Sequence, residues 1–151
     1  MNTAFPTVRP SVGGVSIQET EQGPSAGQWI RTGLMLGAGL AATGIALGAF
    51  GAHALRSIAT REAIDIFDTG VRYQMYHAFG LIASGLIGQG RGNSDVWIRR
   101  SIFLFTSGTV LFSGSLYVLA LTGVSWLGYL TPFGGLAFIG GWISLFLAAR
   151  G

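Results

Sequence analysis

The chain is 151 residues long, which suits a single domain, and only 10% of its residues are charged, against roughly a quarter in soluble domains. Half of the residues are hydrophobic and 25 are Gly, so polar side chains are too few to cover the apolar surface in water. The net charge of +3 is too small for a nucleic-acid binder, and the absence of Cys excludes disulfides and thiolate chemistry; the composition predicts a membrane protein.

Residues 1–28 differ from the rest of the chain. They contain three of the four prolines, Pro6, Pro10 and Pro24, together with scattered Gly, Ser, Thr and Gln, and they show no helical period. A segment of this kind has too little apolar content to pack. We expect a disordered N-terminal tail at 1–28, followed by a membrane domain at 29–151.

Gaps between charged residues locate the membrane spans, because a helix that crosses the bilayer needs about 20 mostly apolar residues. The uncharged stretch between Arg100 and Arg150 is long enough for two spans. Turn residues in its middle end at Thr131 and Pro132, a pair typical of a helix start. The sequence therefore predicts an all-α membrane protein, a bundle of four transmembrane helices. The predicted spans are about 32–55, 73–90, 101–122 and 131–149.

The first span carries small residues at every fourth position, namely Gly44, Gly48 and Ala52. This spacing lets two helix backbones approach closely, which is how helices associate in lipid without a hydrophobic driving force. Gly33 and Gly37 precede these residues in a second run of the same spacing. We expect Gly44, Gly48 and Ala52 to be helix-packing residues of a tight bundle.

Apolar residues also recur at helical spacing between the first two spans, with charged residues among them. This pattern predicts a short interfacial amphipathic helix that lies in the headgroup layer, and an ordinary polar loop is the alternative. The apolar positions are Leu55, Ile58, Ala59, Ala63, Ile66 and Phe67.

The arginines predict the orientation of the chain, since cytoplasmic loops are enriched in positive residues. Four spans place five arginines near one membrane face and three near the other, which favours both termini in the cytoplasm. The first group is Arg31, Arg91, Arg99, Arg100 and Arg150, and the second is Arg56, Arg61 and Arg72.

Polar residues gather near one predicted membrane face, at the end of the first span and the start of the second. His53 and His77 each lie within one or two helical turns of that face, so they are candidates for neighbours. Ionisable groups in a membrane are functional candidates, but hydrogen bonds between helices explain the same residues, and we favour this structural interpretation. The cluster consists of His53, Asp68, Arg72, Tyr73, Tyr76 and His77.

The same residues limit the chemistry of the chain. Two histidines without a third ligand make a poor zinc site, and no metalloprotease motif is present, so we expect no metal and no cofactor. No nucleophile with its base is evident, so we expect no catalytic residues. A haem bound by His53 and His77 is the minority alternative.

Four blocks of sequence resemble a known family. In their order and spacing they are similar to the small multi-pass membrane proteins of the transmembrane protein 256 family, also catalogued as domain of unknown function 423. The resemblance covers about 34–149 and implies a bacterial inner-membrane protein with mitochondrial-type relatives, but no activity. The blocks are GAFGAH at 48–53, FDTGVRYQMYH at 67–77, FSGSLY at 112–117 and TPFGG at 131–135.

These observations favour a non-enzymatic protein of the inner membrane. We expect it to pack in the lipid bilayer as an assembly or accessory partner of another membrane protein, or as a homo-oligomer. A small oligomeric transporter or channel is the alternative, although Thr43 and Ser144 are the few polar side chains near mid-depth. A redox module built on His53 and His77 is the third hypothesis.

Overall fold

The computed structural model describes residues 26–89 and 96–150. Of the tail predicted at 1–28, residues 1–25 lie outside this part of the chain, and residues 26–28 are the start of a helix. Within it every regular element is helical, as the sequence predicts. The α-helices are α1 (Ala26–His53), α2 (Arg61–Gly88), α3 (Val96–Thr109), α4 (Ser115–Thr122) and α5 (Thr131–Arg150). The shorter elements are the 3₁₀ helices η1 (Leu55–Ser57) and η3 (Ser125–Leu130) and the π-helical turn η2 (Val110–Gly114).

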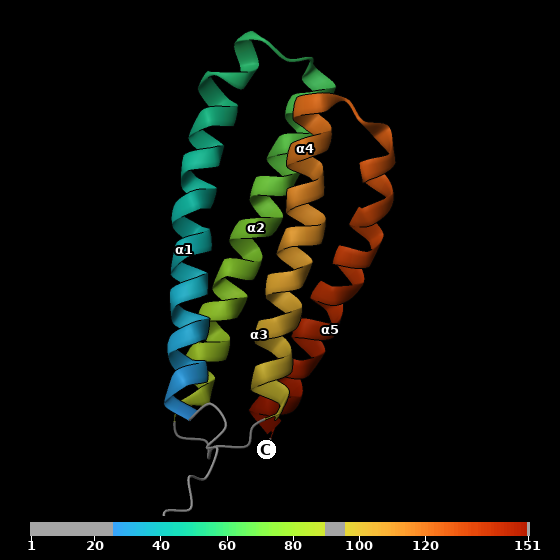
Figure 1. The fold of residues 1–151 in the computed structure, drawn as a ribbon. Coiled ribbons are helices and arrows are strands. Elements are labelled where there is room, and N and C mark those ends of the chain that lie inside the picture. Colours follow the sequence, from blue (N-terminus) through green and yellow to red (C-terminus); the bar gives the residue numbers. More distant parts are fainter. Residues whose placement is uncertain (1–25, 90–95, 151) are drawn as a thin grey trace, which may run out of the picture.

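The helices form an elongated bundle (Figure 1). α3, η2 and α4 follow one another without a break and make a single rod, which lies between α2 and α5. α1 lies at one edge of the bundle, where it packs mainly on α2, and α5 lies at the other edge. Gly123, in the left-handed conformation that Gly adopts without strain, ends α4 by donating its N–H to the Leu119 carbonyl oxygen.

Three helical segments in the described residues are long and apolar enough to cross a membrane: Gly27–Ser57, Val96–Thr122 and Ser125–Arg150. The sequence predicted a fourth span at 73–90, but α2 does not reach the same apolar content. The reason is chemical, because Arg72, Gln74 and His77 interrupt its apolar residues.

The predicted interfacial helix between the first two spans does not form as a separate element. Residues 55–57 make one 3₁₀ turn, and residues 61–67 are the first turns of α2 itself. The Thr60 side chain caps α2 by accepting a hydrogen bond from the Ala63 N–H at 3.2 Å. From Phe67 the buried face continues through Gly70 and Gln74, so the apolar pattern belongs to one long helix.

Glycine permits the close approach of α1 and α2. A Cβ atom added at Gly37 would lie 2.7 Å from the Ala78 carbonyl oxygen, and one at Gly33 would lie 2.9 Å from the Leu81 carbonyl oxygen. On the opposite helix, a Cβ at Gly85 would lie 3.0 Å from the Ile30 carbonyl oxygen. A larger residue at these points would force the opposite backbone to shift, so the two backbones are in close contact.

Aromatic rings fill glycine notches in the other half of the bundle. The Phe105 ring lies between α2 and α5, where a Cβ at Gly80 would come within 3.1 Å of it and one at Gly141 within 2.6 Å. Phe138 of α5 packs in the same way against Gly108 of α3. The core thus combines the largest side chains with the residue that has none, and this matched packing fixes how closely α2, α3 and α5 approach.

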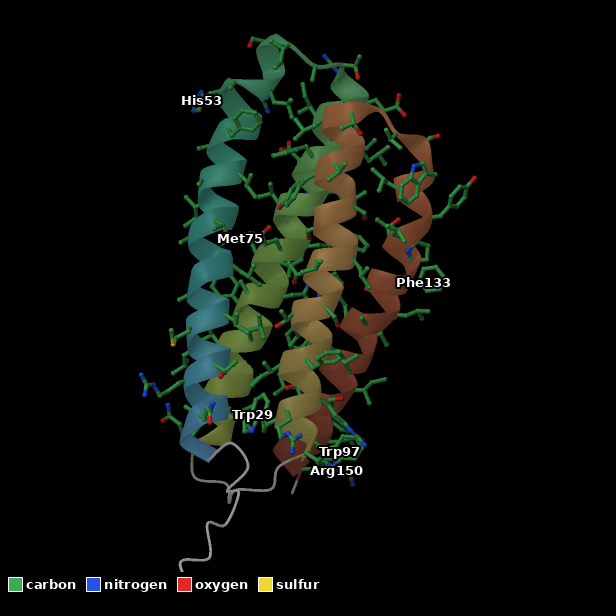
Figure 2. The ribbon with its side chains drawn as sticks, in the orientation of Figure 1. Trp29, His53, Met75, Trp97, Phe133 and Arg150 are labelled. Carbon is green, nitrogen blue, oxygen red and sulfur yellow. The ribbon has the colours of Figure 1, made fainter. Side chains whose placement is uncertain are left out.

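The bundle exposes many large apolar side chains and buries several polar ones alongside its apolar core, unlike a soluble protein. On α2, Gln74 and Ser84 are buried, whereas the side chains of Phe79 and Leu86 are 58% and 53% exposed. Phe133 of α5 likewise points away from the bundle (Figure 2). Such a surface requires a lipid environment, and the inward polar groups require partners within the protein.

The close contact between α1 and α2 predicts opposite effects of two similar substitutions. Gly37→Ala places a methyl group against the α2 backbone and should lower the stability of the bundle by about 1–3 kcal/mol. Gly39→Ala is the control, since nothing lies within 4 Å of the added methyl, and it should be neutral or stabilising by up to about 1 kcal/mol. Thermal unfolding in mild detergent measures both; equal effects of the two changes would contradict the packing.

Candidate functional site

The structure separates the two histidines that the sequence placed at one membrane face. α1 and α2 run antiparallel with Gly51 against Phe67, Gly44 beside Met75 and Gly37 against Ala78. His77 is therefore level with the part of α1 between Gly37 and Gly44. His53 is exposed at the end of α1, nine residues beyond Gly44, or ~14 Å along the axis.

The two histidines of one chain are therefore not neighbours, a proximity that the sequence had left open, and the reason is where α2 starts. The sequence argument treated Arg72 as the membrane boundary, but α2 begins at Arg61. His77 consequently lies near the middle of the helix. The two imidazoles of one chain do not face a common cavity, which removes the geometric basis for a haem held between them.

His77 lies instead in a box of aromatic rings. Its ring is stacked on Phe138, with 3.3 Å between centroids and an interplanar angle of 2°. The rings of Phe105 and Trp142 lie 5.6 and 6.2 Å away. The His77 Nδ1–H donates to the Tyr73 carbonyl oxygen at 2.7 Å, so one ring nitrogen is occupied within α2. In the described residues, no group of three or more His, Asp or Glu is placed to hold a metal ion.

The remaining members of the predicted cluster point in different directions. The Arg72 Nε donates to the backbone oxygen of Asp68 at 3.5 Å, a contact within one helical turn. Tyr73 and Tyr76 are exposed, with ring centroids 5.9 Å apart, and the Tyr73 ring is also stacked on Phe112 at 4.5 Å between centroids. The cluster thus divides into four exposed residues, the half-buried Asp68 and one buried histidine.

The Gln74 side chain on α2 is hydrogen-bonded to both α1 and α4. The sequence argument did not single out this residue. Its Nε2 donates to the Leu40 carbonyl oxygen at 2.8 Å and to the Thr43 Oγ1 at 2.9 Å, both on α1. Its Oε1 accepts from the Tyr117 hydroxyl of α4 at 2.8 Å. We call these four residues the Gln74 network. The signal in the sequence is that Gln74 falls on the helical face shared by Phe67 and Gly70.

The π-helical turn lies beside this network. The Tyr117 ring packs on Phe67 at 4.8 Å between centroids, and a Cβ at Gly70 would lie 2.8 Å from the Tyr117 ring. Ser113, inside the turn, is fully buried, and its Oγ is the single buried side-chain polar atom without a hydrogen-bond partner in the described residues. A π-helical turn shifts the helical register, so residues after 114 face a different direction from those of an uninterrupted α-helix.

A second polar contact joins α2 to α3. The Ser101 Oγ donates to the Ser84 Oγ at 2.9 Å, and both side chains are fully buried. The Ser84 hydroxyl in turn donates to the Gly80 carbonyl oxygen at 2.8 Å. Together with the Gln74 network, this pair gives α2 a hydrogen bond to each of its neighbours α1, α3 and α4, so the polar residues act as interhelical links.

The predicted packing residues of α1 differ in their surroundings. A Cβ at Gly44 would lie 2.7 Å from the Met75 Sδ, and one at Gly48 would lie 3.4 Å from the Val71 Cγ1. Ala52 is exposed, and Gly51 beside it is buried against Phe67. The contact with α2 therefore follows Gly37, Gly44 and Gly51, which are seven residues apart.

Comparison with known proteins identifies relatives of the chain. The family described as protein of unknown function (DUF423) matches residues 47–135, which include the whole of α2, α3 and α4. The UPF0382 membrane protein YwdK of Bacillus subtilis is 44% identical over 121 residues, covering 77% of this chain and 94% of that protein. The UPF0382 inner membrane protein YgdD of Escherichia coli is 37% identical over 105 residues, covering 70% of this chain and 79% of YgdD. No solved structure matches the chain.

The Gln74 network predicts coupling between two helices. Gln74→Leu leaves the Tyr117 hydroxyl without its acceptor, and Tyr117→Phe then removes that unpaired group, so the double variant should lose less stability than the two single losses combined. We expect a coupling energy between about 0.6 and 1.7 kcal/mol, measured by unfolding in detergent. Ser144→Ala is the control, because Ser144 donates to its own helix at Gly140 and should show no coupling with Gln74→Leu. Strict additivity of the Gln74 and Tyr117 variants would contradict the network.

Proposed function

We propose that this chain, which belongs to the DUF423 family of membrane proteins, crosses the inner membrane four times and serves as a packing or assembly partner of another membrane protein. Its relatives are named as membrane proteins, and the chain is an integral membrane protein of no established activity. The observation that carries the proposal is a second face of small residues on α1, exposed and unused within the bundle.

The proximity of α1 and α2 supports a fourth span. The contacts of Gly51 with Phe67 and of Gly33 with Leu81 and Gly85 place α2 beside α1 over most of its length. α1 is apolar and long enough to span, and α2 has 28 residues, or ~42 Å, so it is long enough as well. Of the polar residues that lower its apolar content, Gln74 and His77 are buried and hydrogen-bonded, and Arg72 donates to the Asp68 carbonyl oxygen of its own helix.

With four spans, the two ends of the bundle carry different numbers of the described arginines. The α1 start, the α3 start and the α5 end share one end of the bundle, and α2 begins at the other (Figure 1). By the positive-inside rule the first end, with four arginines against three, is cytoplasmic, and both termini lie there. The four are Arg31, Arg99, Arg100 and Arg150, and the three are Arg56, Arg61 and Arg72.

This orientation is testable with topology reporters. A reporter fused after Gly151 and one inserted between Asn93 and Ser94 should both read as cytoplasmic, and one inserted between Ala59 and Thr60 should read as periplasmic. If α2 did not cross the membrane, all three reporters would read from the same side, because two spans separate Ser94 from Gly151 in either case. Alkaline phosphatase and green fluorescent protein activities, measured in the same strain, distinguish these outcomes.

The exposed face of α1 has the residues that favour contact with another helix. Ala38, Ala42, Ala46 and Ala49 are all exposed, and their spacing of three or four residues puts them on one side of the helix. α1 is also the least buried of the three apolar segments. Small residues on a lipid-facing helix permit a second helix to approach its backbone, which is the geometry of membrane-protein association.

The polar residues of the bundle favour this role over transport or catalysis. The amide of Gln74 is bonded at both its nitrogen and its oxygen. Thr43 and Ser144, the polar residues near mid-depth, donate to carbonyl oxygens of their own helices. These groups stabilise the bundle, so they supply neither a polar lining for a pore nor a reactive pair.

The proposal predicts which alanine variants lose the partner. Ala42→Leu and Ala46→Leu should reduce the yield of a copurifying membrane protein about tenfold, since overpacking of a helix contact costs about 1–3 kcal/mol. Ala42→Ser keeps a small side chain at the same place and should retain the partner. The measurement is quantitative mass spectrometry after purification in mild detergent.

The controls of this experiment separate the alternatives. Detergent melting should be unchanged in all three variants, because these positions do not contact α2. An equal partner yield from Ala42→Leu and wild type would contradict the proposal, and loss of a homo-oligomer instead of a second protein would identify the partner as another copy of the chain.

A further inference from the structure

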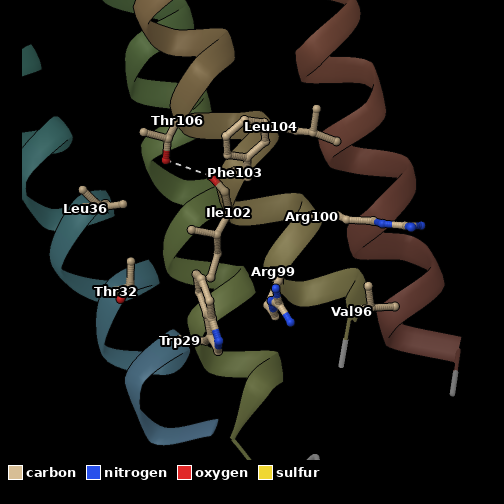
Figure 3. Close-up of a pocket in the computed structure, with 10 residues that line it drawn as sticks. All are labelled: Trp29, Thr32, Leu36, Val96, Arg99, Arg100, Ile102, Phe103, Leu104 and Thr106. Atoms are coloured by element: carbon tan, nitrogen blue, oxygen red, sulfur yellow. Dashed lines mark hydrogen bonds between the residues drawn. The ribbon is translucent and has the colours of Figure 1, made fainter. Parts of the chain in front are cut away.

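We infer that the groove between α1 and α3 binds one anionic phospholipid, with its phosphate at Arg99 and an acyl chain along the apolar wall. The groove is a hollow of about 690 Å³ on the surface of the bundle. Figure 3 shows its walls: Trp29, Thr32 and Leu36 on α1, and residues between 96 and 106 on α3.

The cationic end of the groove is held in place by aromatic rings. The Arg99 guanidinium carbon lies 5.2 Å from the centre of the Trp29 ring, and that of Arg100 lies 4.8 Å from the centre of the Trp97 ring. A tryptophan beside an arginine near the start of a membrane helix is typical of the headgroup level. Arg99 and Arg100 both line the hollow; Figure 3 shows the Arg99 side chain beside Trp29, whereas the Arg100 side chain extends toward α5, so Arg99 is the cation beside the α1 wall of the groove.

The remainder of the groove is suited to a hydrocarbon chain. Leu36 and Phe103 present 36% and 70% of their side chains to the surface. The Thr106 hydroxyl donates to the Ile102 carbonyl oxygen at 2.8 Å, as the dashed line in Figure 3 shows, and the Thr32 hydroxyl donates to the Gln28 carbonyl oxygen at 2.8 Å. Neither hydroxyl therefore needs a partner from a molecule in the groove.

The length of the groove favours a lipid over a helix. From Trp29 to Leu36 it extends seven residues, or ~10 Å, about two thirds of the ~15 Å of hydrocarbon in one leaflet. A transmembrane helix from a partner would need a contact surface through both leaflets, whereas the lining of this hollow ends at Leu36 and Thr106. The groove has a charged end followed by ~10 Å of apolar wall, just as a phospholipid has a charged headgroup followed by an acyl chain.

The charge distribution favours an anionic headgroup. In the described part of the chain, every acidic residue lies in the first turns of α2, at the end of the bundle opposite to Arg99. The acidic residues are Glu62, Asp65 and Asp68, and the arginines at the groove end are Arg31, Arg99, Arg100 and Arg150.

Native mass spectrometry of the full chain in a neutral detergent tests the inference. The protein is mixed with equal amounts of phosphatidylglycerol and phosphatidylcholine, and the ratio of the two bound lipids is measured. Wild type should prefer phosphatidylglycerol. Arg99→Gln should lower this preference about fivefold, because one basic residue near a membrane surface contributes that much to the attraction of an anionic lipid.

Three comparisons make the test specific. Arg31→Gln removes the same charge at the same end but outside the groove, and it should keep the wild-type ratio. Leu36→Trp fills the groove and should reduce the binding of both lipids, while sn-glycerol 3-phosphate, which has the headgroup charge without the chain, should not displace phosphatidylglycerol. The inference is overturned if wild type binds both lipids equally, if Arg31→Gln and Arg99→Gln have the same effect, if Leu36→Trp binds lipid as well as wild type, or if glycerol phosphate competes.

Discussion

Contact between glycine and a large group on the next helix is the interaction on which the rest of this bundle depends. In a bilayer, lipid is as apolar as a leucine side chain, so burial of apolar area does not drive helices together. The bundle instead gains dispersion contacts at notches, where Gly80 and Gly141 accept Phe105, Gly108 accepts Phe138, and Gly37 accepts the backbone of α2. A glycine and the group that packs against it fit together at only one separation and one register of the two helices. This requirement positions the other side chains of the core.

The hydrogen bonds between helices follow from that register. Once Gly44 lies beside Met75, the adjacent Gln74 is within reach of Leu40 and Thr43, and its own oxygen meets Tyr117 from the other side. A buried amide in apolar surroundings is costly unless all its strong donors and acceptors are paired. Gln74 is therefore tolerated only because close packing supplies its partners, and it adds a directional constraint that rings and glycines lack.

The sequence predicted the helical, membrane-embedded character of the chain well, and the start of α2 less well. The apolar runs predicted an all-helical membrane protein, and the helix that follows Thr131 and Pro132 begins where those residues indicate. The start of α2 was misplaced because the argument counted charges, and a charge such as Arg72 does not end a helix whose backbone bonds are all internal. The buried face of α2, with Phe67, Gly70 and Gln74 at steps of three and four, carries the correct information. Read by periodicity, that face extends α2 into the charged segment and moves His77 away from the membrane boundary.

The same periodicity distinguishes two faces of α1, one that packs on α2 and one that is exposed, although both are rich in small residues. Gly44 and Ala46 are two residues apart, which at 100° per residue places them ~200° apart around the helix. Gly44 lies against α2, and Ala46 is exposed on the far side. A small residue on the first face holds the bundle together, so enlarging it changes folding, whereas a small residue on the second face has no contact within the chain to stabilise. The fold does not require alanine on that second face, because α1 already packs on α2 through glycine. These additional small residues, together with the position of α1 at the edge of the bundle, favour a docking face for another helix.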